Sequence, residues 1–261
     1  MDHVGTYRRT LPVSLDRMYE NALDWEHLPH LHGSSFQAIQ CLDSGAWGWR
    51  AKVTGLNGSD SVLQLSLDRD CRRWITRNLE GPNEGAEIWT HVFVETPNQL
   101  DIVVDFFVPG VAVHAREKLG RAFARQYETL YDEDVWMMTE RQRQIDRRMQ
   151  PRRNEERLVL AIPAASDLPL QVELSGQQFM LNQCGGEWVV YPAVCPHQMG
   201  PLTSDLSAAG EVRCPWHGYT FDVKSGDCTR GGSCRFGQVP GIVESSSELA
   251  LSWVAAAAGS D

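Results

Sequence analysis

The chain has 261 residues, of which 42% are hydrophobic and 22% are charged, and its formal net charge is −10. This is a globular composition. The negative charge argues against nucleic acid as a partner, and no apolar run approaches the length of a membrane span. The polar start of the chain does not resemble a secretion signal, so we expect a soluble, cytoplasmic protein with no nucleic-acid or membrane partner.

The first half of the chain predicts a sheet between two helical segments. Residues 14–28 are typical of a helix, and from about Ala112 to Met149 the absence of proline and of strand-like alternation predicts one long helix. Between them, runs of β-branched and aromatic residues are separated by Gly, Asn and Pro. These runs are 47–54, 61–67, 87–95 and 99–108. An antiparallel sheet covered by a long helix is an α+β layout.

The composition changes near Pro151, and a proline tends to end a helix before itself. We therefore expect a domain boundary at about 150–156, between a first domain of residues 1–150 and a second domain of residues 156–254. The arginine-rich connector, residues 141–157, is either a solvated helix end with a linker or a docking patch for an acidic redox partner. Beyond it, short strand-like runs alternate with turns, which is typical of a small all-β domain. These runs are 158–163, 170–174, 177–184, 187–192 and 218–223.

Two loops of the second domain each offer one cysteine and one histidine. They are Cys195-x-His197 and Cys214-x-x-His217, with sixteen residues between His197 and Cys214. A proline follows each cysteine and fixes the backbone there. The seven cysteines are an odd number and a poor disulfide framework. Zinc modules usually draw two cysteines from one knuckle, whereas a [2Fe–2S] cluster can take two thiolates on one iron and two imidazoles on the other. The pattern favours the cluster, with zinc as the alternative.

The stretch C-x-H-x16-C-x2-H, with CPWHGYTFDVKSGDC, resembles the Rieske [2Fe–2S] domain over about residues 156–254. The resemblance implies that Cys195 and Cys214 ligate one iron, and that His197 and His217 ligate the other. The extra loop cysteines of high-potential Rieske proteins are missing, so the domain resembles the lower-potential kind found in oxygenases and their ferredoxins. The remaining cysteines of this domain are interpreted as inert, small hydrophobic residues. They are Cys184, Cys228 and Cys234.

A second group of candidate ligands lies in residues 19–36. Three of the eight histidines of the chain fall within six residues there, namely His27, His30 and His32. A helix with a break at Pro29 could bring two of them together. Spacing alone does not choose between them, and the alternative is a polar helix end with incidental histidines.

The predicted long helix supplies a carboxylate. At the 3.6-residue period, Asp134 lies in the middle of an apolar stripe, whereas Asp132 and Glu133 point away from it. Burying a carboxylate is costly unless it is paired or bound to a cation. Asp134 is therefore either a metal ligand or the partner of a buried arginine such as Arg141.

Two histidines and one carboxylate form the facial triad of mononuclear non-haem Fe(II) oxygenases. The motif E-N-x-x-D-x-x-H-x4-H, at residues 20–32, resembles the catalytic domain of Rieske ring-hydroxylating oxygenases, which has a helix-grip (START-like) fold. The later segment DEDVWMMTERQ resembles the part of that family that carries the carboxylate ligand. The resemblance selects His32 over His30 and implies that His27, His32 and Asp134 hold the iron.

The resemblance also gives a role to Asp24, three residues before the first iron histidine. In the family this aspartate bridges the two metal centres by hydrogen bonds, which here implies a link from His27 to a Rieske histidine, His217. The order of the two domains is reversed relative to most members, and the catalytic domain is short. In the family the cluster of one subunit usually serves the iron of its neighbour, which implies a homotrimer. In this chain the electron route could lie within one chain or between chains.

We therefore expect a Rieske oxygenase that uses O₂ to hydroxylate or demethylate a small aromatic or apolar substrate. No G-x-G-x-x-G fingerprint follows a strand, so electrons from NAD(P)H are expected through a separate ferredoxin or reductase. The substrate pocket should lie between the sheet and the long helix, and six side chains are candidates either for its lining or for plain core packing. They are Trp89, His91, Phe93, Tyr127, Tyr131 and Met138. The alternative function is an electron-transfer Rieske protein fused to a ligand-binding helix-grip domain without iron, and a zinc-binding module is a third.

Overall fold

The computed structural model describes residues 1–151 and 155–253. The chain divides into two compact units, Met1–Gln142 and Arg143–Asp261, and the division falls inside the long helix α3 (Val113–Met149). Part of the predicted boundary, residues 152–154, lies outside the described residues, as does residue 254 at the end of the predicted second domain.

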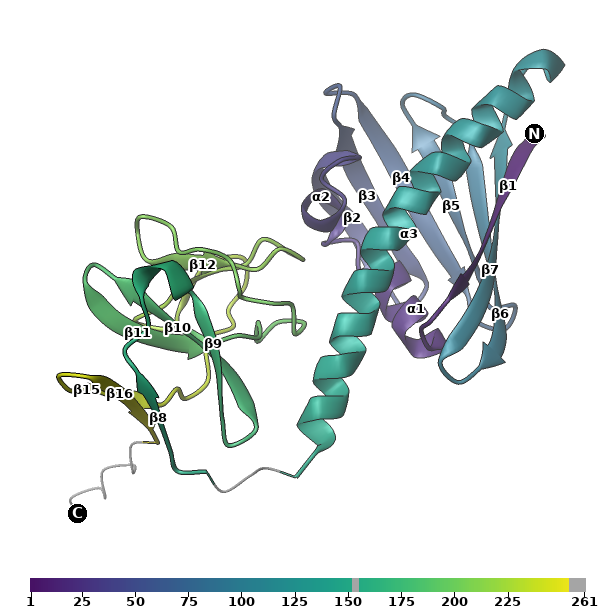
Figure 1. The fold of residues 1–261 in the computed structure, drawn as a ribbon. Helices are drawn as coiled ribbons and strands as arrows, with labels where there is room; N and C mark the ends of the chain where they lie inside the picture. Colours follow the sequence, from purple (N-terminus) through teal and green to yellow (C-terminus); the bar gives the residue numbers. More distant parts are fainter. Residues whose placement is uncertain (152–154, 254–261) are drawn as a thin grey trace. The chain divides into compact units, whose positions relative to one another are not determined.

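In the first unit, a seven-stranded antiparallel sheet lies against α3 (Figure 1). Its strand order is β1-β7-β6-β5-β4-β3-β2. The strands are β1 (Asp2–Leu11), β2 (Phe36–Gly45), β3 (Gly48–Gly55), β4 (Asp60–Asp68), β5 (Arg73–Glu80), β6 (Glu87–Thr96) and β7 (Gln99–Val108). Two short helices, α1 (Leu15–Leu23) and α2 (Leu28–Leu31), connect β1 to β2. A sheet that wraps one long C-terminal helix is the helix-grip, START-like fold that the sequence predicted.

The strand β7 shows how the sequence makes this sheet. Its side chains alternate between buried and half-buried, as period-two patterning requires when one face is covered. On the covered face, Phe106 is inaccessible to solvent. Its ring stacks on Phe123 of α3 at a centroid distance of 5.2 Å and meets the edge of Tyr127, one turn further along, at 5.1 Å. These aromatic contacts fix which face of α3 lies on the sheet.

The helix α3 also crosses β1 at a glycine pair. A Cβ atom added at Gly5 would lie 2.9 Å from the Cα of Gly120, and one added at Gly120 would clash with the backbone of Val4. Only glycine on both elements allows their backbones to approach so closely. This crossing holds the N-terminal strand against the helix.

Most predicted elements of the first unit are confirmed. The runs 47–54, 61–67, 87–95 and 99–108 are β3, β4, β6 and β7, and the predicted long helix is α3. The strands β1, β2 and β5 were not predicted. Arginines interrupt the apolar pattern of β1 and β5, but their backbones still pair with the neighbouring strands, and the β5 arginines Arg73 and Arg77 are half-buried and paired with Asp68 and Glu87.

The second unit is built from three small antiparallel sheets, with strand orders β11-β10-β9, β12-β13-β14 and β15-β16-β8. The strands are β8 (Arg157–Ala161), β9 (Leu170–Leu174), β10 (Gln177–Cys184), β11 (Glu187–Pro192), β12 (Glu211–Arg213), β13 (Thr220–Asp222), β14 (Cys228–Arg230), β15 (Gly241–Glu244) and β16 (Glu248–Ser252). A core of Leu174, Phe179, Val190 and Leu251 joins strands of different sheets. The predicted small all-β domain is confirmed.

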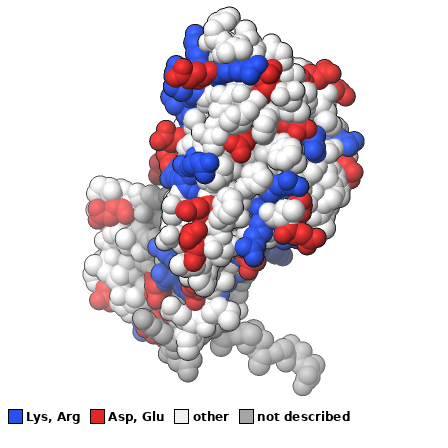
Figure 2. All heavy atoms as spheres, turned by 90° about the vertical axis from the view of Figure 1, so that its right-hand side faces the viewer, with Lys and Arg blue, Asp and Glu red and all other residues white. Residues whose placement is uncertain are grey.

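None of the helices in the described ranges is long and apolar enough to cross a membrane. On the face of the first unit that Figure 2 shows, Lys and Arg are interspersed with Asp and Glu. That face therefore carries no continuous basic surface of the kind that binds a phosphate backbone.

Candidate metal centres

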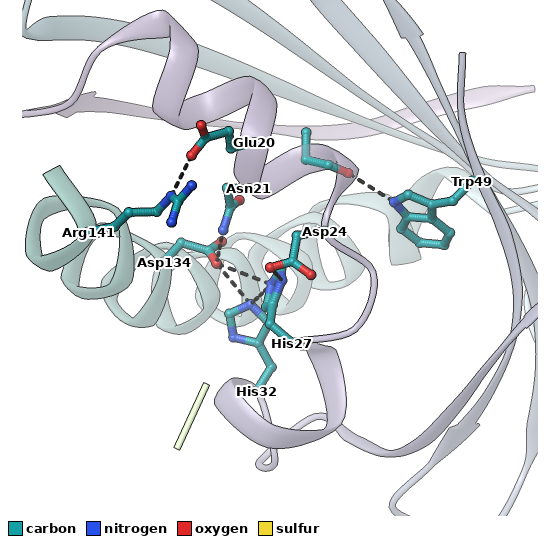
Figure 3. A network of polar contacts seen from close by, with 9 residues as sticks. Glu20, Asn21, Asp24, His27, His32, Trp49, Asp134 and Arg141 are labelled. Carbon is teal, nitrogen blue, oxygen red and sulfur yellow. Dashed lines mark hydrogen bonds and ion pairs between the residues drawn. The ribbon is translucent and has the colours of Figure 1, made fainter. Parts of the chain in front are cut away.

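Two histidines and one aspartate meet in the first unit. The ligand atoms of His27, His32 and Asp134 all lie within 4.8 Å of one another (Figure 3). The three residues are 3%, 2% and 8% exposed. His30, the third histidine of the segment, is not part of this group. The structure thus brings together the three side chains that the sequence predicted as a metal site.

Helix ends position both histidines. The helix α2 is a single turn with a proline in its first positions, where proline is tolerated. His27 is its N-cap and His32 its C-cap. Five residues apart across one turn, the two rings reach the same point, with their Nε2 atoms 3.2 Å apart. The preceding helix α1 is fixed on the sheet by Trp49, whose Nε1 donates to the carbonyl of Ala22 at 2.9 Å.

Asp134 comes from the middle of α3, on the face that covers the sheet. Its Oδ1 lies 3.1 Å from Nε2 of His32 and 3.5 Å from Nε2 of His27, and it accepts a hydrogen bond from Asn21 at 2.8 Å. The predicted alternative, a pair between Asp134 and Arg141, is wrong. Arg141 donates to Glu20 at 2.6 Å, and no arginine or lysine in the described part of the chain pairs with Asp134.

The three ligand atoms form a triangle with sides of 3.1, 3.2 and 3.5 Å. Donor atoms that bind one ion at roughly 2.1 Å and at right angles are separated by about 3.0 Å. The donor set of two imidazoles and one carboxylate is that of non-haem Fe(II) sites. The residues therefore fit a single metal ion in both spacing and chemistry.

Charge at the site also fits a cation. Burial opposes ionisation of Asp134, but the hydrogen bond and charge of His32 outweigh it and hold the pKa of Asp134 below its ordinary value. Burial likewise opposes protonation of His32, but the bonds to Asp134 and Glu133 raise the pKa of His32 above its ordinary value. Both shifts favour an ionised Asp134 beside a positive charge at His32, and a bound cation would supply that positive charge in place of the proton.

The contact between His32 and Glu133 was not predicted. Nδ1 of His32 lies 2.6 Å from Oε2 of Glu133. The helical period had placed Glu133 away from the apolar stripe, and that estimate ignored the reach of a long side chain to a residue beside the helix. When the Glu133 carboxylate accepts the proton of Nδ1, the neutral ring carries its lone pair on Nε2, the atom that faces Asp134 and His27.

Asp24, at the C-cap of α1, also lies beside the site. Its Oδ2 is 3.7 Å from Nδ1 of His27, which is longer than a hydrogen bond. Its side chain is 9% exposed. His27 and His32 thus each have an acidic residue on the ring nitrogen that faces away from Asp134, one at hydrogen-bonding distance and one in looser contact.

The three-residue group lies at one end of a cavity of about 290 Å³ between the sheet and α3. This volume is near the lower limit of small-molecule sites. The walls are mainly apolar and include Leu63, Trp74, Phe106 and Tyr127. Asp134 lies seven residues from Tyr127 along α3, which corresponds to about 10 Å of helix. The cavity therefore extends along the helix, away from the group.

The prediction for the cavity wall was correct for two of the three helix residues and wrong for the strand, and the third helix residue, Met138, is packed in the core instead. Tyr127 and Tyr131 of α3 line the cavity, but Trp89, His91 and Phe93 of β6 do not. The opposite face of β6, with Ile88 and Thr90, lines it instead. Period-two alternation identifies which residues share a face but not which face turns inward.

In the second unit, the two Cys/His loops are the same turn built twice. The amide of Cys195 donates to the carbonyl of Gly200, and that of Cys214 donates to the carbonyl of Tyr219, both at 2.8 Å. Four residues after each cysteine, an amide donates back to the cysteine carbonyl at 3.0 Å. The residues at that position, Met199 and Gly218, have φ angles of 67° and 69°. Glycine suits this conformation, whereas Met199 is an unusual residue there.

This repeated turn brings the four predicted ligands together. Both cysteines are 1% exposed, and the rings of His197 and His217 lie 4.7 Å apart. The two thiols share a hydrogen bond, which lowers the pKa of Cys214 to about 7, while that bond and burial raise the pKa of Cys195. Two buried, adjacent thiols with one easily lost proton suit metal–thiolate ligation.

The backbone of the first loop passes close to the thiol of the second. A Cβ atom at Gly200 would lie 2.7 Å from Sγ of Cys214 and 2.8 Å from the ring of Trp216, so only glycine fits at this wall. Two thiolates on one side and two imidazoles on the other are the donor set of a Rieske cluster. The residues fit that group.

Comparison with known families supports this assignment. Residues 159–236 match the family model for the Rieske [2Fe-2S] domain. The second unit contains a Rieske domain. Such a domain implies a [2Fe–2S] cluster and electron-transfer partners. The Rieske domain holds all four predicted cluster residues within its matched range, and the first unit lies outside that range.

Curated relatives match the chain over short stretches. Apoptosis-inducing factor 3 of Homo sapiens is 39% identical over 57 residues, which are 22% of this chain and 9% of that protein. The chloroplastic pheophorbide a oxygenase of Oryza sativa subsp. japonica is 44% identical over 46 residues, which are 17% of this chain and 8% of that protein. The chain thus spans less than a tenth of either relative, and its similarity to Rieske oxygenases is weak.

Several solved structures align with part of the chain at low sequence identity. The Zhui aromatase/cyclase of Streptomyces sp. R1128 has a TM-score of 0.44 at 16% identity, covering 54% of this chain and 94% of that one. A START superfamily protein of Mycobacterium smegmatis has a TM-score of 0.41 at 13% identity and covers 53% and 98%. The ferredoxin of carbazole 1,9a-dioxygenase from Nocardioides aromaticivorans has a TM-score of 0.33 at 20% identity and covers 36% and 96%.

Proposed function

We propose that this protein is a Rieske-type oxygenase that hydroxylates or demethylates a small apolar or aromatic molecule, with Fe(II) held by His27, His32 and Asp134. One observation carries the proposal. A buried carboxylate and two buried imidazoles converge at the end of an apolar cavity, in a chain that also contains a Rieske domain. In this proposal residues 1–150 form the catalytic domain and residues 156–254 the Rieske domain.

The two metal groups would divide the chemistry. When bound, the [2Fe–2S] cluster held by Cys195, Cys214, His197 and His217 supplies single electrons, and the Fe(II) ion supplies the activation of O₂. The protein would hold the ligand atoms in place, exclude bulk water from the metal site and supply the negative charge of Asp134. His27 and His32 present Nε2 atoms, and Asp134 presents an oxygen whose place is fixed by the amide of Asn21.

The cavity supplies the substrate site in this proposal. Its apolar walls would hold an organic molecule beside the three ligands and keep bulk water away from them. The hydroxyl of Tyr131 bonds to Thr90, and burial raises the pKa values of Tyr127 and Tyr131 well above that of free tyrosine. Both phenols therefore stay neutral and leave the cavity without added negative charge.

Asp24 is proposed as the acceptor for the Nδ1–H of His27, a contact of 3.7 Å that metal binding would tighten. The predicted link from His27 through Asp24 to His217 stays a prediction, within one chain or between the chains of a homotrimer. Electrons would come from NAD(P)H through a separate ferredoxin or reductase.

The competing function is an electron carrier whose first domain binds a ligand without iron. The Rieske domain and the apolar cavity suit both functions, so the metal-ligand group decides between them. A carrier has no need for two imidazoles and a carboxylate that converge at one buried point, whereas that donor set is what a non-haem iron site requires.

Metal analysis tests the proposal. The full chain is produced with iron and sulfide, purified without oxygen, and assayed for iron and for acid-labile sulfide. We expect about three irons per chain, two in the cluster and one in the first domain. Asp134→Ala should leave about two irons with an unchanged cluster spectrum. Asp132→Asn is the matched control, because Asp132 is adjacent in sequence but its side chain is 63% exposed and pairs with Arg9.

Two irons per chain in the unaltered protein, or a third iron that survives Asp134→Ala, would contradict the proposal. If the third iron is present and depends on Asp134, O₂ consumption with a surrogate reductase then serves to screen candidate apolar substrates.

A further inference from the structure

The Rieske domain carries a pair of cysteines outside the four cluster residues. An antiparallel bridge joins Asp227 to Arg235, and their side chains form an ion pair at 3.3 Å. Continuing this register by one residue would set Cys228 opposite Cys234, and the two thiols are in hydrogen-bond contact. Directly opposed residues of antiparallel strands have Cα atoms about 4.5 to 5.5 Å apart, which lies within the range that a disulfide spans. The register therefore places two thiols where a bond between them requires little backbone movement.

The thiols themselves are in contact and within reach of solvent. Both cysteines are half-buried and neither is in a disulfide. Burial, and then the neighbouring Cys228, raise the pKa of the Cys234 thiol. Cys228 donates its S–H to the carbonyl of Arg230 at 3.2 Å. Every residue between the two cysteines, 229–233, is exposed, so a small oxidant can reach this loop.

The loop between the cysteines packs toward the cluster residues. A Cβ atom at Gly231 would lie 2.6 Å from the ring of Tyr219, and one at Gly232 would lie 3.1 Å from it. The loop backbone thus lies directly on Tyr219. The other face of that ring stacks on His197 at a centroid distance of 4.3 Å and an angle of 2°. Two contacts therefore connect the cysteine-bounded loop to a predicted cluster ligand.

We propose that Cys228 and Cys234 form a reversible disulfide that closes the 229–233 loop over Tyr219 and His197. The oxidant is a low-molecular-weight disulfide. The Cys228 thiolate attacks one of its sulfurs and one thiolate leaves. Cys234 loses its proton, attacks the sulfur of Cys228 in the mixed disulfide, and the second thiolate leaves. The two protein thiols lose two electrons and two protons in all, and the oxidant is reduced to two thiols. A disulfide that solvent can reach in this way is reduced again by excess thiol.

This inference does not depend on the proposed oxygenase activity. It needs only the Rieske domain and the strand register within it, and it would hold equally for an electron carrier. The earlier interpretation of Cys228 and Cys234 as inert hydrophobic residues treated each cysteine singly, because the sequence does not show their register.

The sequence around the pair allows a direct test. Trypsin cleaves after Lys224, Arg230 and Arg235, so Cys228 falls in the peptide SGDCTR and Cys234 in GGSCR. The holoprotein is reduced, desalted under nitrogen, and equilibrated with mixtures of reduced and oxidised glutathione. Free thiols are then alkylated, and the digest is analysed without reduction. We expect the two peptides joined, lighter by two hydrogen atoms than their sum, and separated again by excess dithiothreitol.

Cys234→Ser is the matched variant. It keeps the attacking thiol but removes the one that closes the bond, so it should accumulate the mixed disulfide of glutathione on SGDCTR. The proposal is overturned if the unaltered protein yields both peptides alkylated, or if it accumulates the same mixed disulfide as the variant. It is also overturned if GGSCR is joined instead to CPWHGYTFDVK, the peptide of Cys214.

A second measurement tests the link to the cluster. Visible circular dichroism and the midpoint potential of the cluster are recorded with the pair reduced and oxidised, at constant iron content. We expect both to shift when the loop is closed, and to remain constant in a Cys228→Ser, Cys234→Ser double variant. Equal spectra and potentials in the two states of the unaltered protein would show that closing the loop does not reach His197.

Discussion

Replacing Glu133 by alanine should weaken metal binding at the proposed iron site while leaving the fold and the Rieske cluster intact. The carboxylate of Glu133 lies 2.6 Å from Nδ1 of His32, a ring that is almost fully buried, and its own side chain is 30% exposed. Without this acceptor, the ring can rotate or place its proton on Nε2, the atom that faces Asp134. Either change competes with metal ligation.

The magnitude follows from the contact. Hydrogen bonds to charged groups contribute about 1.5 to 3 kcal/mol, and loss of an outer partner of a metal-bound histidine typically costs about 10- to 100-fold in affinity. Because nearly a third of Glu133 is exposed, water can partly replace its carboxylate. We therefore expect about tenfold weaker binding, which is about 1.4 kcal/mol. Glu133→Gln keeps an acceptor oxygen and should lose less.

The assay is calorimetric titration of the cluster-loaded protein with Co(II), which is stable in air and accepts the same ligands. Asp132→Asn is the control for loss of charge, since it removes the neighbouring carboxylate of an exposed ion pair with Arg9. If Glu133→Ala binds Co(II) as tightly as the unaltered protein, while Asp134→Ala does not bind it, the argument for Glu133 is refuted. Equal losses for the Gln and Ala variants would assign the effect to charge instead of hydrogen bonding.

Three further predictions concern packing and protonation. Gly120→Ala should destabilise the first unit by about 1 to 3 kcal/mol in urea unfolding, because the added methyl group meets the β1 backbone. Ala122→Gly is the control, at an exposed position of α3 two residues after Gly120. It should cost only the difference in helix propensity, about 1 kcal/mol. Gly200→Ala should lower cluster content, measured as acid-labile sulfide, since its methyl group would crowd Sγ of Cys214. Burial raises the pKa of Tyr127 above its ordinary 10.0. Above about pH 10 the folded state therefore keeps a proton that the unfolded chain loses, and the free energy of unfolding should fall as the pH rises. Tyr127→Phe should reduce the slope of that fall.

Much of the architecture could be predicted because it is local. The long uninterrupted helix, the apolar runs between turn residues and the short strands after Pro151 are properties of neighbouring residues, and they are where the sequence predicted them. The Cys/His loops are also local features, because the cysteine and histidine of each loop lie within four residues of each other and share one tight turn. A family model matches this part of the chain.

The metal-ligand group in the first unit required more than local pattern. Spacing left His30 and His32 equivalent, and only the family resemblance favoured His32. The single turn of α2, which places His27 and His32 at its two ends, is what separates them from His30 in space. The partner of Asp134 was also open, and the structure places Arg141 on Glu20.

Sequence by itself determined the two kinds of domain, the two Cys/His loops inside the Rieske domain, and the presence of one carboxylate on an apolar helix face. Tertiary structure alone decided which face of β6 turns inward, that Glu133 reaches His32, and that the thiols of Cys228 and Cys234 meet. The reason is physical. Periodicity repeats along one element and can be read from it, whereas contacts between elements depend on register, crossing and side-chain reach, which no single stretch of the chain encodes.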